Sequence, residues 1–322
     1  MSDIDLTARM LHLRQIPVAT MVASPILREL AASMEERTLG PGEHVFRQGE
    51  PIDGMVLLTE GALDLRRDGR PFGVLSAPQT VGFLPILART PAPYDAITRT
   101  EVAALELSAE TLFDLFADHF ELLVATLRYL AERLLLEYQD LPASALGMKG
   151  VDMGRVPRTP IDLVRRIVML QKVSGFASAN VNALAALARQ IEEVRLPAGT
   201  PLWKTGDRAD RVLFLVEGAV ACVTPDGRRF RYGSGTGVGG METIAGRPRW
   251  YDASTETEIV AFWGHTTDTL DLFEHQFRMA MDFVAMLASA ELGILARKVE
   301  AGQDPLERKQ VVERLGAIRF GA

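Results

Sequence analysis

Cysteine and histidine are scarce in this sequence of 322 residues. The single cysteine, Cys222, cannot form an internal disulfide, and it excludes a zinc site built from several thiolates. None of the five histidines is spaced as His-x-His or His-x-x-x-His, the pattern from which metal-dependent β-barrel enzymes take ligands. We therefore expect no metal site and no resident cofactor.

Long apolar runs and an excess of basic charge are also missing. The most apolar stretch, residues 279–296, contains Asp282 and Glu291, and the acidic start of the chain is unlike a secretory signal. The formal net charge of −7 argues against a protein that coats nucleic acid. We expect a cytoplasmic protein without a membrane span.

Motifs for catalysis are missing as well. The sequence contains neither the Gly-x-Ser-x-Gly turn of hydrolases nor the Gly-x-x-x-x-Gly-Lys phosphate loop. Residues 235–240 are rich in glycine, but they do not follow a parallel strand, so we do not assign them to a dinucleotide-binding loop. We predict no catalytic residues and no enzymatic activity.

An internal repeat is the strongest feature that the sequence does contain. A constant spacing of 157 residues relates two series of positions: Gly42, Gly49, Gly61, Gly82, Pro91, Tyr94-Asp95-Ala96 and Thr100-Glu101, and Gly199, Gly206, Gly218, Gly239, Pro248, Tyr251-Asp252-Ala253 and Thr257-Glu258. So many residues at one fixed spacing indicate a duplicated domain.

Each half is predicted to begin with helix and to continue as short strands. Helical spacing of apolar residues occurs in pieces within 7–38, where Ser24-Pro25 is typical of a helix start, and again within 181–191. Short strands with regular glycines follow, and Asp68-Gly69 and Asp226-Gly227 mark hairpin turns. This pattern favours a β-barrel or sandwich.

Each half is predicted to end in a long apolar helical stretch, which runs over 112–134 and then over 270–295. These helices either pack on their own barrel or pair with a second copy, so a homodimer through them stays open. Proline and glycine are dense over 140–160, which predicts a linker, and Asp304-Pro305 predicts a last short helix. The expected organisation is a first domain (1–139), a linker (140–160), a second domain (161–300) and a helical tail (301–322).

The order of these elements resembles the cyclic nucleotide-binding domain. The residues that carry the resemblance are Gly42-Glu43, Gln48-Gly49-Glu50, the apolar strand into Gly61, and Val81-Gly82. Such domains occur in catabolite-activator-type regulators, in regulatory subunits of protein kinase A and in gated channels. The resemblance implies a mainly β fold with α: two tandem jelly-roll-like barrels, each flanked by an N-terminal helix and a long C-terminal helix.

The resemblance also implies where a ligand binds. In this family a short helix directs its N–H groups at the cyclic phosphate, an Arg adds a fork of donors, and a Glu accepts from the ribose. In the first half, Phe83 stands in place of this Glu and Ala92 in place of the Arg, and Pro85 lacks an N–H. The first domain is therefore expected to be degenerate and to bind no nucleotide.

The second half keeps part of this pattern. Arg249 falls on the phosphate Arg, Gly240 replaces the Glu, and Glu242 takes a position that is usually Ala. A carboxylate there satisfies the helix N-terminus and repels phosphate, turns outward, or pairs with Arg247 or Arg249. The candidate ligand-binding residues are Gly239, Gly240, Met241, Glu242, Thr243, Arg249 and Trp250, and a cyclic mononucleotide is expected to bind them only weakly.

We call residues 81–92 and 238–249 the first and second cassettes. The aromatic pair Trp250-Tyr251 follows the second cassette, and it either stacks on a base or belongs to the core. Because Tyr94 repeats Tyr251 in the half that has lost the ligand residues, we predict that Tyr251, with Asp95 and Asp252, is structural. An anion or partner contact at 247–250 is an alternative.

Two functions fit these observations. The first is a non-enzymatic regulatory or signalling protein whose second domain binds a cyclic nucleotide and alters a protein interface. The alternative is a protein-interaction scaffold that keeps the fold without the ligand. A transcriptional regulator is a third class, but it needs a helix-turn-helix that neither the linker nor the short tail has room for. We therefore expect no sequence-specific binding to DNA.

Overall fold

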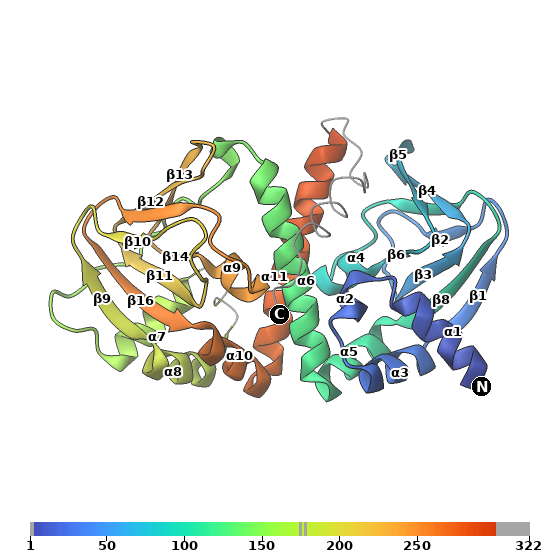
Figure 1. The fold of residues 1–322 in the computed structure, drawn as a ribbon, viewed down its shortest axis with the longest axis horizontal. Helices are drawn as coiled ribbons and strands as arrows, with labels where there is room; N and C mark the ends of the chain where they lie inside the picture. Colours follow the sequence, from blue (N-terminus) through green and yellow to red (C-terminus); the bar gives the residue numbers. More distant parts are fainter. Residues whose placement is uncertain (1–2, 174–175, 177–178, 301–322) are drawn as a thin grey trace. The chain divides into compact units, whose positions relative to one another are not determined.

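The computed structural model describes residues 3–300, apart from 174–175 and 177–178. The chain divides into two compact units, one built from Met1–Thr126 with the chain from Val284 onward, and one from Leu127–Phe283. The divisions fall inside two helices, α6 (Phe120–Asp140) and α11 (Phe277–Glu300). Each unit is a mainly β domain with helices at its ends, as the repeat predicts (Figure 1).

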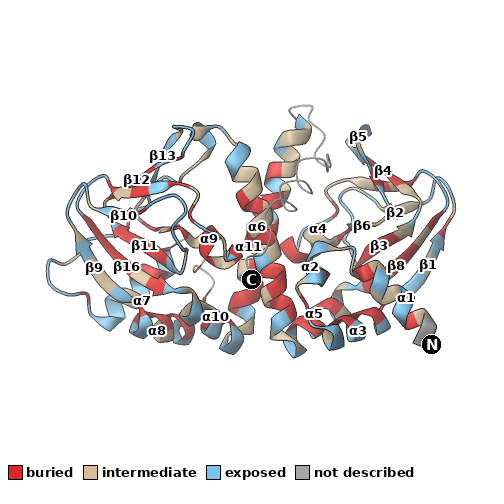
Figure 2. Cartoon of the chain, in the orientation of Figure 1, coloured by how far each residue is buried: buried red, intermediate tan, exposed pale blue. Residues whose placement is uncertain are grey.

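The first unit begins with three short helices, α1 (Asp3–Leu13), α2 (Pro17–Thr20) and α3 (Ser24–Ala32). Its strands are β1 (Glu35–Leu39), β2 (His44–Phe46), β3 (Gly54–Glu60), β4 (Ala62–Arg67), β5 (Arg70–Ser76), β6 (Gln79–Val81), β7 (Asp95–Thr98) and β8 (Val102–Ser108), and α4 (Phe83–Ala88) follows β6. The strands form two antiparallel sheets, β1-β8-β3-β6 and β2-β7-β4-β5. Apolar side chains of both sheets form the buried core (Figure 2).

The second unit repeats this arrangement. The helices that precede its strands, after the later part of α6, are α7 (Leu163–Lys172) and α8 (Val181–Gln190), and α7 was not predicted from the sequence. Its strands are β9 (Glu192–Leu196), β10 (Pro201–Trp203), β11 (Arg211–Glu217), β12 (Ala219–Val223), β13 (Arg229–Gly233), β14 (Thr236–Val238), β15 (Asp252–Thr255) and β16 (Ile259–His265), and α9 (Gly240–Ala245) follows β14. The sheets are β14-β11-β16-β9 and β10-β15-β12-β13.

Backbone hydrogen bonds confirm the alignment of the two halves at the cassettes. The N–H of Gly49 donates to the carbonyl of Ala92 (2.8 Å), and the N–H of Gly206 donates to the carbonyl of Arg249 (2.8 Å). The N–H groups of Ala92 and Arg249 return bonds of 2.9 Å to Glu50 and Asp207. Ala92 and Arg249 therefore occupy equivalent positions, as the constant spacing predicts.

The paired aspartates have the structural role that the repeat predicts. The Asp95 carboxylate accepts from the N–H of Gln48 (2.9 Å), and the Asp252 carboxylate accepts from the N–H of Thr205 (2.7 Å). Each aspartate thus fixes the turn that precedes the paired glycine of its own half, so its repetition reflects the fold rather than a ligand.

Two details of the helices differ from the sequence expectations. Each long C-terminal stretch is two helices, α5 (Ala109–Asp118) before α6, and α10 (Thr266–His275) before α11, because His119 and Gln276 leave the helical conformation. Residues 35–38 belong to strand β1 rather than to a helix. The helix predicted after Asp304 lies outside the described residues.

Among the described helices, α11 alone is long and apolar enough to cross a membrane, by length and composition only. Of its most apolar window, 44% is buried inside the protein.

The predicted linker forms an ordered strap on the second unit. The N–H of Met148 donates to the carbonyl of Arg231 on β13 (3.1 Å), and the N–H of Gly233 donates back to Met148 (3.0 Å). Val151 continues the contact through a bond to Ser234 (2.8 Å). Gly147 has a positive φ of 74°, and a Cβ on it would overlap the Arg231 carbonyl, so this glycine permits the close approach.

Candidate functional site

The second cassette is built around the start of α9. Gly239 has a positive φ of 78° and ends strand β14, which lets the chain turn directly into the helix. The Thr243 hydroxyl donates to the Gly239 carbonyl (2.7 Å) and lies 3.0 Å from the Arg211 carbonyl. A Cβ on Gly239 would overlap the Arg249 guanidinium, so the absence of a side chain at this position leaves room for the arginine.

Arg249 is buried, with only 3% of its surface exposed. Its Nη1 donates to the Gly239 carbonyl (2.7 Å), and its Nη2 donates to the carbonyl of Arg211. The guanidinium also stacks on Trp203, with Cζ 4.2 Å from the ring centroid, an arrangement that favours a cation. Arg249, the residue predicted to bind a cyclic phosphate, is therefore held by hydrogen bonds and a ring contact within the protein.

Glu242 lies beside this cation and is 2% exposed. Its Oε2 is 3.9 Å from the Arg249 Nη1, so the carboxylate neither turns outward nor pairs with Arg247. Burial raises the pKa of the Glu242 carboxyl above its ordinary value, and the positive charge of Arg249 acts in the opposite direction. Of the alternatives open for Glu242, the structure shows two: the approach to Arg249, and an interaction of the carboxyl with its own backbone N–H in the first turn of α9.

Unused hydrogen-bonding capacity remains in this cluster. Among the described residues, no partner reaches Oε1 of Glu242, Nε of Arg249 or Nε1 of Trp203, although all three atoms are buried. Buried polar atoms without partners cost stability, because water has been removed and nothing replaces it. A polar ligand that entered here would find both donors and an acceptor.

The raised pKa of Glu242 predicts a pH dependence of stability. Between the ordinary glutamate value of about 4.3 and the raised pKa of Glu242, the folded domain holds a proton that the unfolded chain releases, so the free energy of unfolding falls as pH rises through this interval. Glu242→Gln should remove this contribution. In urea unfolding at about pH 5 and pH 8, the stability of wild type relative to Glu242→Gln should decrease with pH; a constant difference would contradict the prediction.

Arg247 faces a different acid. Its Nε donates to the Glu132 carboxylate on α6 (2.8 Å), and its Nη2 lies 2.6 Å from the same oxygen. The two side chains are 22% and 12% exposed, so this ion pair is partly shielded from water. Arg247 therefore joins the cassette to α6 within the second unit.

Trp250 and Met241 also pack toward α6. Both contact a small buried cluster formed by Ala131, Leu135 and Ala245. The Trp250 ring stacks on Phe230, with centroids 5.8 Å apart and planes 18° apart. One face of the Trp250 ring is thus covered by Phe230. The cassette contacts α6 through α9, Trp250 and Arg247 together.

The barrel interior next to Arg249 is filled with aromatic side chains. Tyr251 is 1% exposed and packs edge-on against Phe230, with centroids 5.1 Å apart, and Trp203 lies 5.9 Å from Tyr251. Burial raises the pKa of Tyr251 well above its ordinary value, with the nearby Glu242 carboxylate adding to the shift. The burial of Tyr251 supports the structural role predicted for it.

Sequence reasoning missed two residues that hold Arg249, namely Trp203 and Arg211. Arg211 contributes only a backbone carbonyl, which any residue would supply, so no sequence signal could reveal it. Trp203 ends the short strand β10, whose other residues are Pro201 and Leu202, so no alternation with polar residues marks its direction.

The first cassette has the same backbone and different chemistry. Gly82 has a positive φ of 89° and precedes α4, as Gly239 precedes α9. Pro85 and Ala92 are buried, and Phe83 begins the helix. Because Ala92 occupies the place of Arg249, this cassette has neither the cation nor the donor that the family pattern requires.

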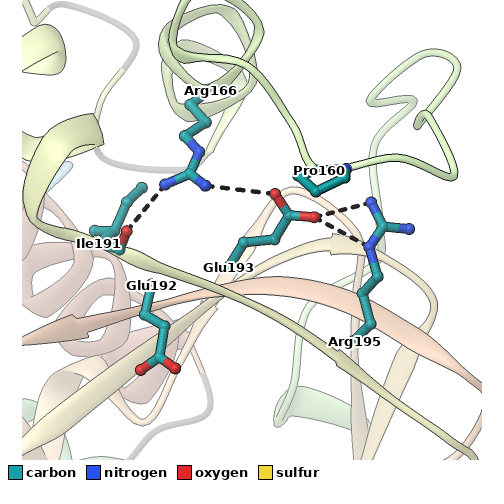
Figure 3. A pocket seen from close by; sticks show the side chains of 6 residues that line it. All are labelled: Pro160, Arg166, Ile191, Glu192, Glu193 and Arg195. Atoms are coloured by element: carbon teal, nitrogen blue, oxygen red, sulfur yellow. Dashed lines mark hydrogen bonds and ion pairs between the residues drawn. The ribbon is translucent and has the colours of Figure 1, made fainter.

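A separate pocket in the second unit lies under the strap and is lined by Pro160, Arg166, Ile191, Glu192, Glu193 and Arg195 (Figure 3). Its central carboxylate, Glu193, lies 3.5 Å from Arg166 and 2.9 Å from Arg195, and accepts from the N–H of Ile161 (2.7 Å). Arg195 donates to the carbonyls of Pro157 and Thr159 (2.8 and 3.0 Å). These charges hold the strap in place.

Metal binding has no candidate in the described part of the chain, where no three His, Cys, Asp or Glu residues are grouped for an ion.

Comparison with known proteins gives partial matches to two channels. The chain is 33% identical over 98 residues to a cyclic nucleotide-gated potassium channel of Rhizobium etli, which is 30% of this chain and 27% of the channel. It is 30% identical over 107 residues to a cyclic nucleotide-gated potassium channel of Mesorhizobium japonicum, which is 33% of this chain and 30% of the channel. The chain thus spans less than a third of the length of either relative.

Matches among solved structures include domains of two regulatory proteins. The regulatory domain of Toxoplasma gondii PKA with cAMP has a TM-score of 0.36 at 15% identity, covering 90% of this chain and 98% of that one. The N-terminal domain of a transcriptional regulator from Streptomyces coelicolor has a TM-score of 0.37 at 30% identity, covering 40% and 94%.

The sequence profile of the cyclic nucleotide-binding domain matches residues 36–119 and 193–275, one segment in each unit. Each matched segment contains the strands, the paired glycines and the cassette helix of its half. The matches cover just over half of the chain, and the protein belongs to the cyclic nucleotide-binding domain family, with two such domains in tandem.

Proposed function

We propose that this chain is a non-enzymatic regulatory protein whose second domain binds a cyclic mononucleotide weakly, in competition with its own Glu242. The observation that carries the proposal is the buried contact between Glu242 and Arg249. Arg249 lies at the family's phosphate position, and Glu242 supplies a negative charge to it. A ligand phosphate has to displace that carboxylate, or wait for its protonation, before it reaches the guanidinium.

The output of binding follows from the contacts of the cassette. Arg247 pairs with Glu132, and Trp250 packs on Ala131 and Leu135, so a shift of α9 acts on α6. A ligand that binds one arrangement of α9 better than another changes the population of α6 positions and any protein interface that includes this helix. A cytoplasmic location and pairing through the C-terminal helices stay predictions.

Calorimetry with cyclic AMP and cyclic GMP tests the ligand. Wild type should bind with a Kd of tens of micromolar or weaker, roughly −6 kcal/mol. Glu242→Ala removes the competing carboxylate and should tighten binding about tenfold, which corresponds to about 1.4 kcal/mol. Arg249→Lys keeps a cation beside Glu242 but loses the fork of donors, and should bind less tightly than wild type.

Thermal unfolding of each variant establishes that the second domain is folded in the assay. If wild type binds neither nucleotide at millimolar concentration and Glu242→Ala does not restore binding, the sensor proposal is wrong.

The scaffold is the second candidate, and a specific observation favours it. Trp203, Phe230 and Tyr251 fill the interior beside Arg249, which leaves a base and ribose little room without their movement. Under this alternative the Glu242–Arg249 pair only closes the barrel. The same calorimetry decides between the two, because a scaffold gives no heat with wild type or with Glu242→Ala.

A further inference from the structure

Strand β5 forms an open edge of the first domain. In the sheet β2-β7-β4-β5 it pairs with β4 only, and within the described residues no strand lies on its other side (Figure 1). An edge strand presents a row of N–H and C=O groups to which another strand can pair.

The equivalent edge of the second domain is occupied. On β5, Val74 pairs with Asp64 and Ser76 pairs with Ala62. The residues 157 positions later pair in the same way on β13, Arg231 with Ala221 and Gly233 with Ala219. The Arg231 carbonyl and the Gly233 N–H both bond to Met148 of the strap. By this equivalence the Val74 carbonyl and the Ser76 N–H point away from β4, and the described residues supply no backbone partner for them.

The charge at the hairpin end of the open edge is positive, and Asp64, which lies across from Val74 on β4, is 3.9 Å from the guanidinium of Arg99. Arg66, Arg67 and Arg70 stand at the hairpin end of β4 and β5, and within the described part of the chain none is paired with a carboxylate. The one acid at this turn, Asp68, is held by Gln48, whose Nε2 donates to it (2.8 Å). The second hairpin differs, because Arg228 pairs with Asp226 (2.8 Å) and Arg231 with Glu256 (3.0 Å).

Val74 adds an apolar contact to the same edge. It is 43% exposed in the middle of β5, four residues from Arg70. An exposed valine between arginine and open backbone groups fits a strand that carries both carboxylates and apolar side chains.

We propose that the edge of β5, residues Arg70–Ser76, is the docking site for an extended acidic segment of a protein partner. The segment adds to the sheet as a further strand, its backbone bonds to Val74 and Ser76, and its carboxylates face the three arginines. A second copy of β5 would bring three more arginines to the same place, so charge disfavours self-pairing. The site is independent of nucleotide binding by the second domain.

The occupant is an ordinary strand rather than a copy of the strap. A Cβ on Gly233 would lie 2.6 Å from the Cα of Gly150, so the strap approaches β13 more closely than side chains allow. β5 has Ser76 at that position, and a strand at the usual spacing of about 4.8 Å leaves room for its side chain.

Fluorescence anisotropy with the full chain tests the site. The probe is a labelled octapeptide of alternating Glu and Val, compared with one of alternating Lys and Val and with a backbone N-methylated form of the acidic peptide. The acidic peptide should bind, the basic one should not, and N-methylation should weaken binding at least tenfold by removing the N–H groups. Arg70→Glu should also weaken it at least tenfold, whereas Arg229→Glu, an exposed arginine on β13, should leave it unchanged.

Equal binding of the N-methylated peptide would show charge attraction without strand addition and would overturn the proposal. Equal effects of Arg70→Glu and Arg229→Glu would do the same, since the site would not be β5. Sedimentation of the chain alone tests the other occupant, because a dimer that Val74→Glu dissociates would assign the edge to a second copy.

Discussion

Arg249→Ala is expected to destabilise the second domain by about 3–5 kcal/mol at neutral pH, the usual cost of breaking a buried ion pair from one side. The substitution leaves Glu242 buried without its cation and removes the hydrogen bonds to the Gly239 and Arg211 carbonyls. It also removes the contact with Trp203. Urea unfolding followed by tryptophan fluorescence measures this directly, because Trp203, Trp250 and Trp263 all belong to the second domain.

Two further variants isolate the cause. Arg249→Ala combined with Glu242→Gln should recover part of the loss, since the neutral amide needs no cation. Arg247→Ala breaks a pair that is partly exposed to solvent, and should cost less than Arg249→Ala. If Arg249→Ala costs no more than Arg247→Ala, the buried pair does not stabilise the cassette as the geometry indicates.

Gly218→Ala should destabilise the second domain by about 2–5 kcal/mol, combining backbone strain with a steric clash. Gly218 has a φ of 91°, and a Cβ there would lie 2.7 Å from Oγ1 of Thr257 and would overlap the Glu258 carbonyl. Gly199 is the matched control, because its φ is 80° and nothing lies within 4 Å of its Cβ position. Gly199→Ala should therefore cost only the strain, about 1–2 kcal/mol. Both values are measured by urea unfolding.

The first domain gives an independent repetition of this experiment. Gly61 and Gly42 correspond to Gly218 and Gly199, and the space around each matches its counterpart. Gly61→Ala should lower the free energy of unfolding more than Gly42→Ala does. This unfolding is followed by circular dichroism, because the first half of the chain has no tryptophan. Equal losses within either pair would show that the backbone moves to accept the methyl group.

The repeat predicted a duplicated domain, and the resemblance to the cyclic nucleotide-binding domain predicted the fold and the place of the cassettes. Paired glycines fall where the backbone needs a positive φ, so their spacing located equivalent turns without any structure. The same spacing matched Ala92 with Arg249, which the backbone bonds confirm. Positions in a duplicated backbone are therefore readable from sequence alone.

The direction of the key side chains could not be predicted. Glu242 had several possible partners within the cassette, and the place of the partner that it meets, Arg249, depends on Trp203 and Arg211, which are 46 and 38 positions away from Arg249 in the chain. The contacts of the strap with the second unit could not be predicted either, because glycine is common both in linkers and where two backbones approach closely. Composition does not separate these two uses.

The strap also changes which parts of the chain tolerate insertion and deletion. Proline- and glycine-rich segments between domains usually accept changes in length. Here Met148 and Val151 are in register with β13, and Pro157, Thr159 and Ile161 are tied to Arg195 and Glu193, so both ends of the segment are fixed. One added residue between these anchor points would shift one end out of register. The composition of the strap is typical of a linker whose length can vary, but its anchor points constrain the number of residues between them.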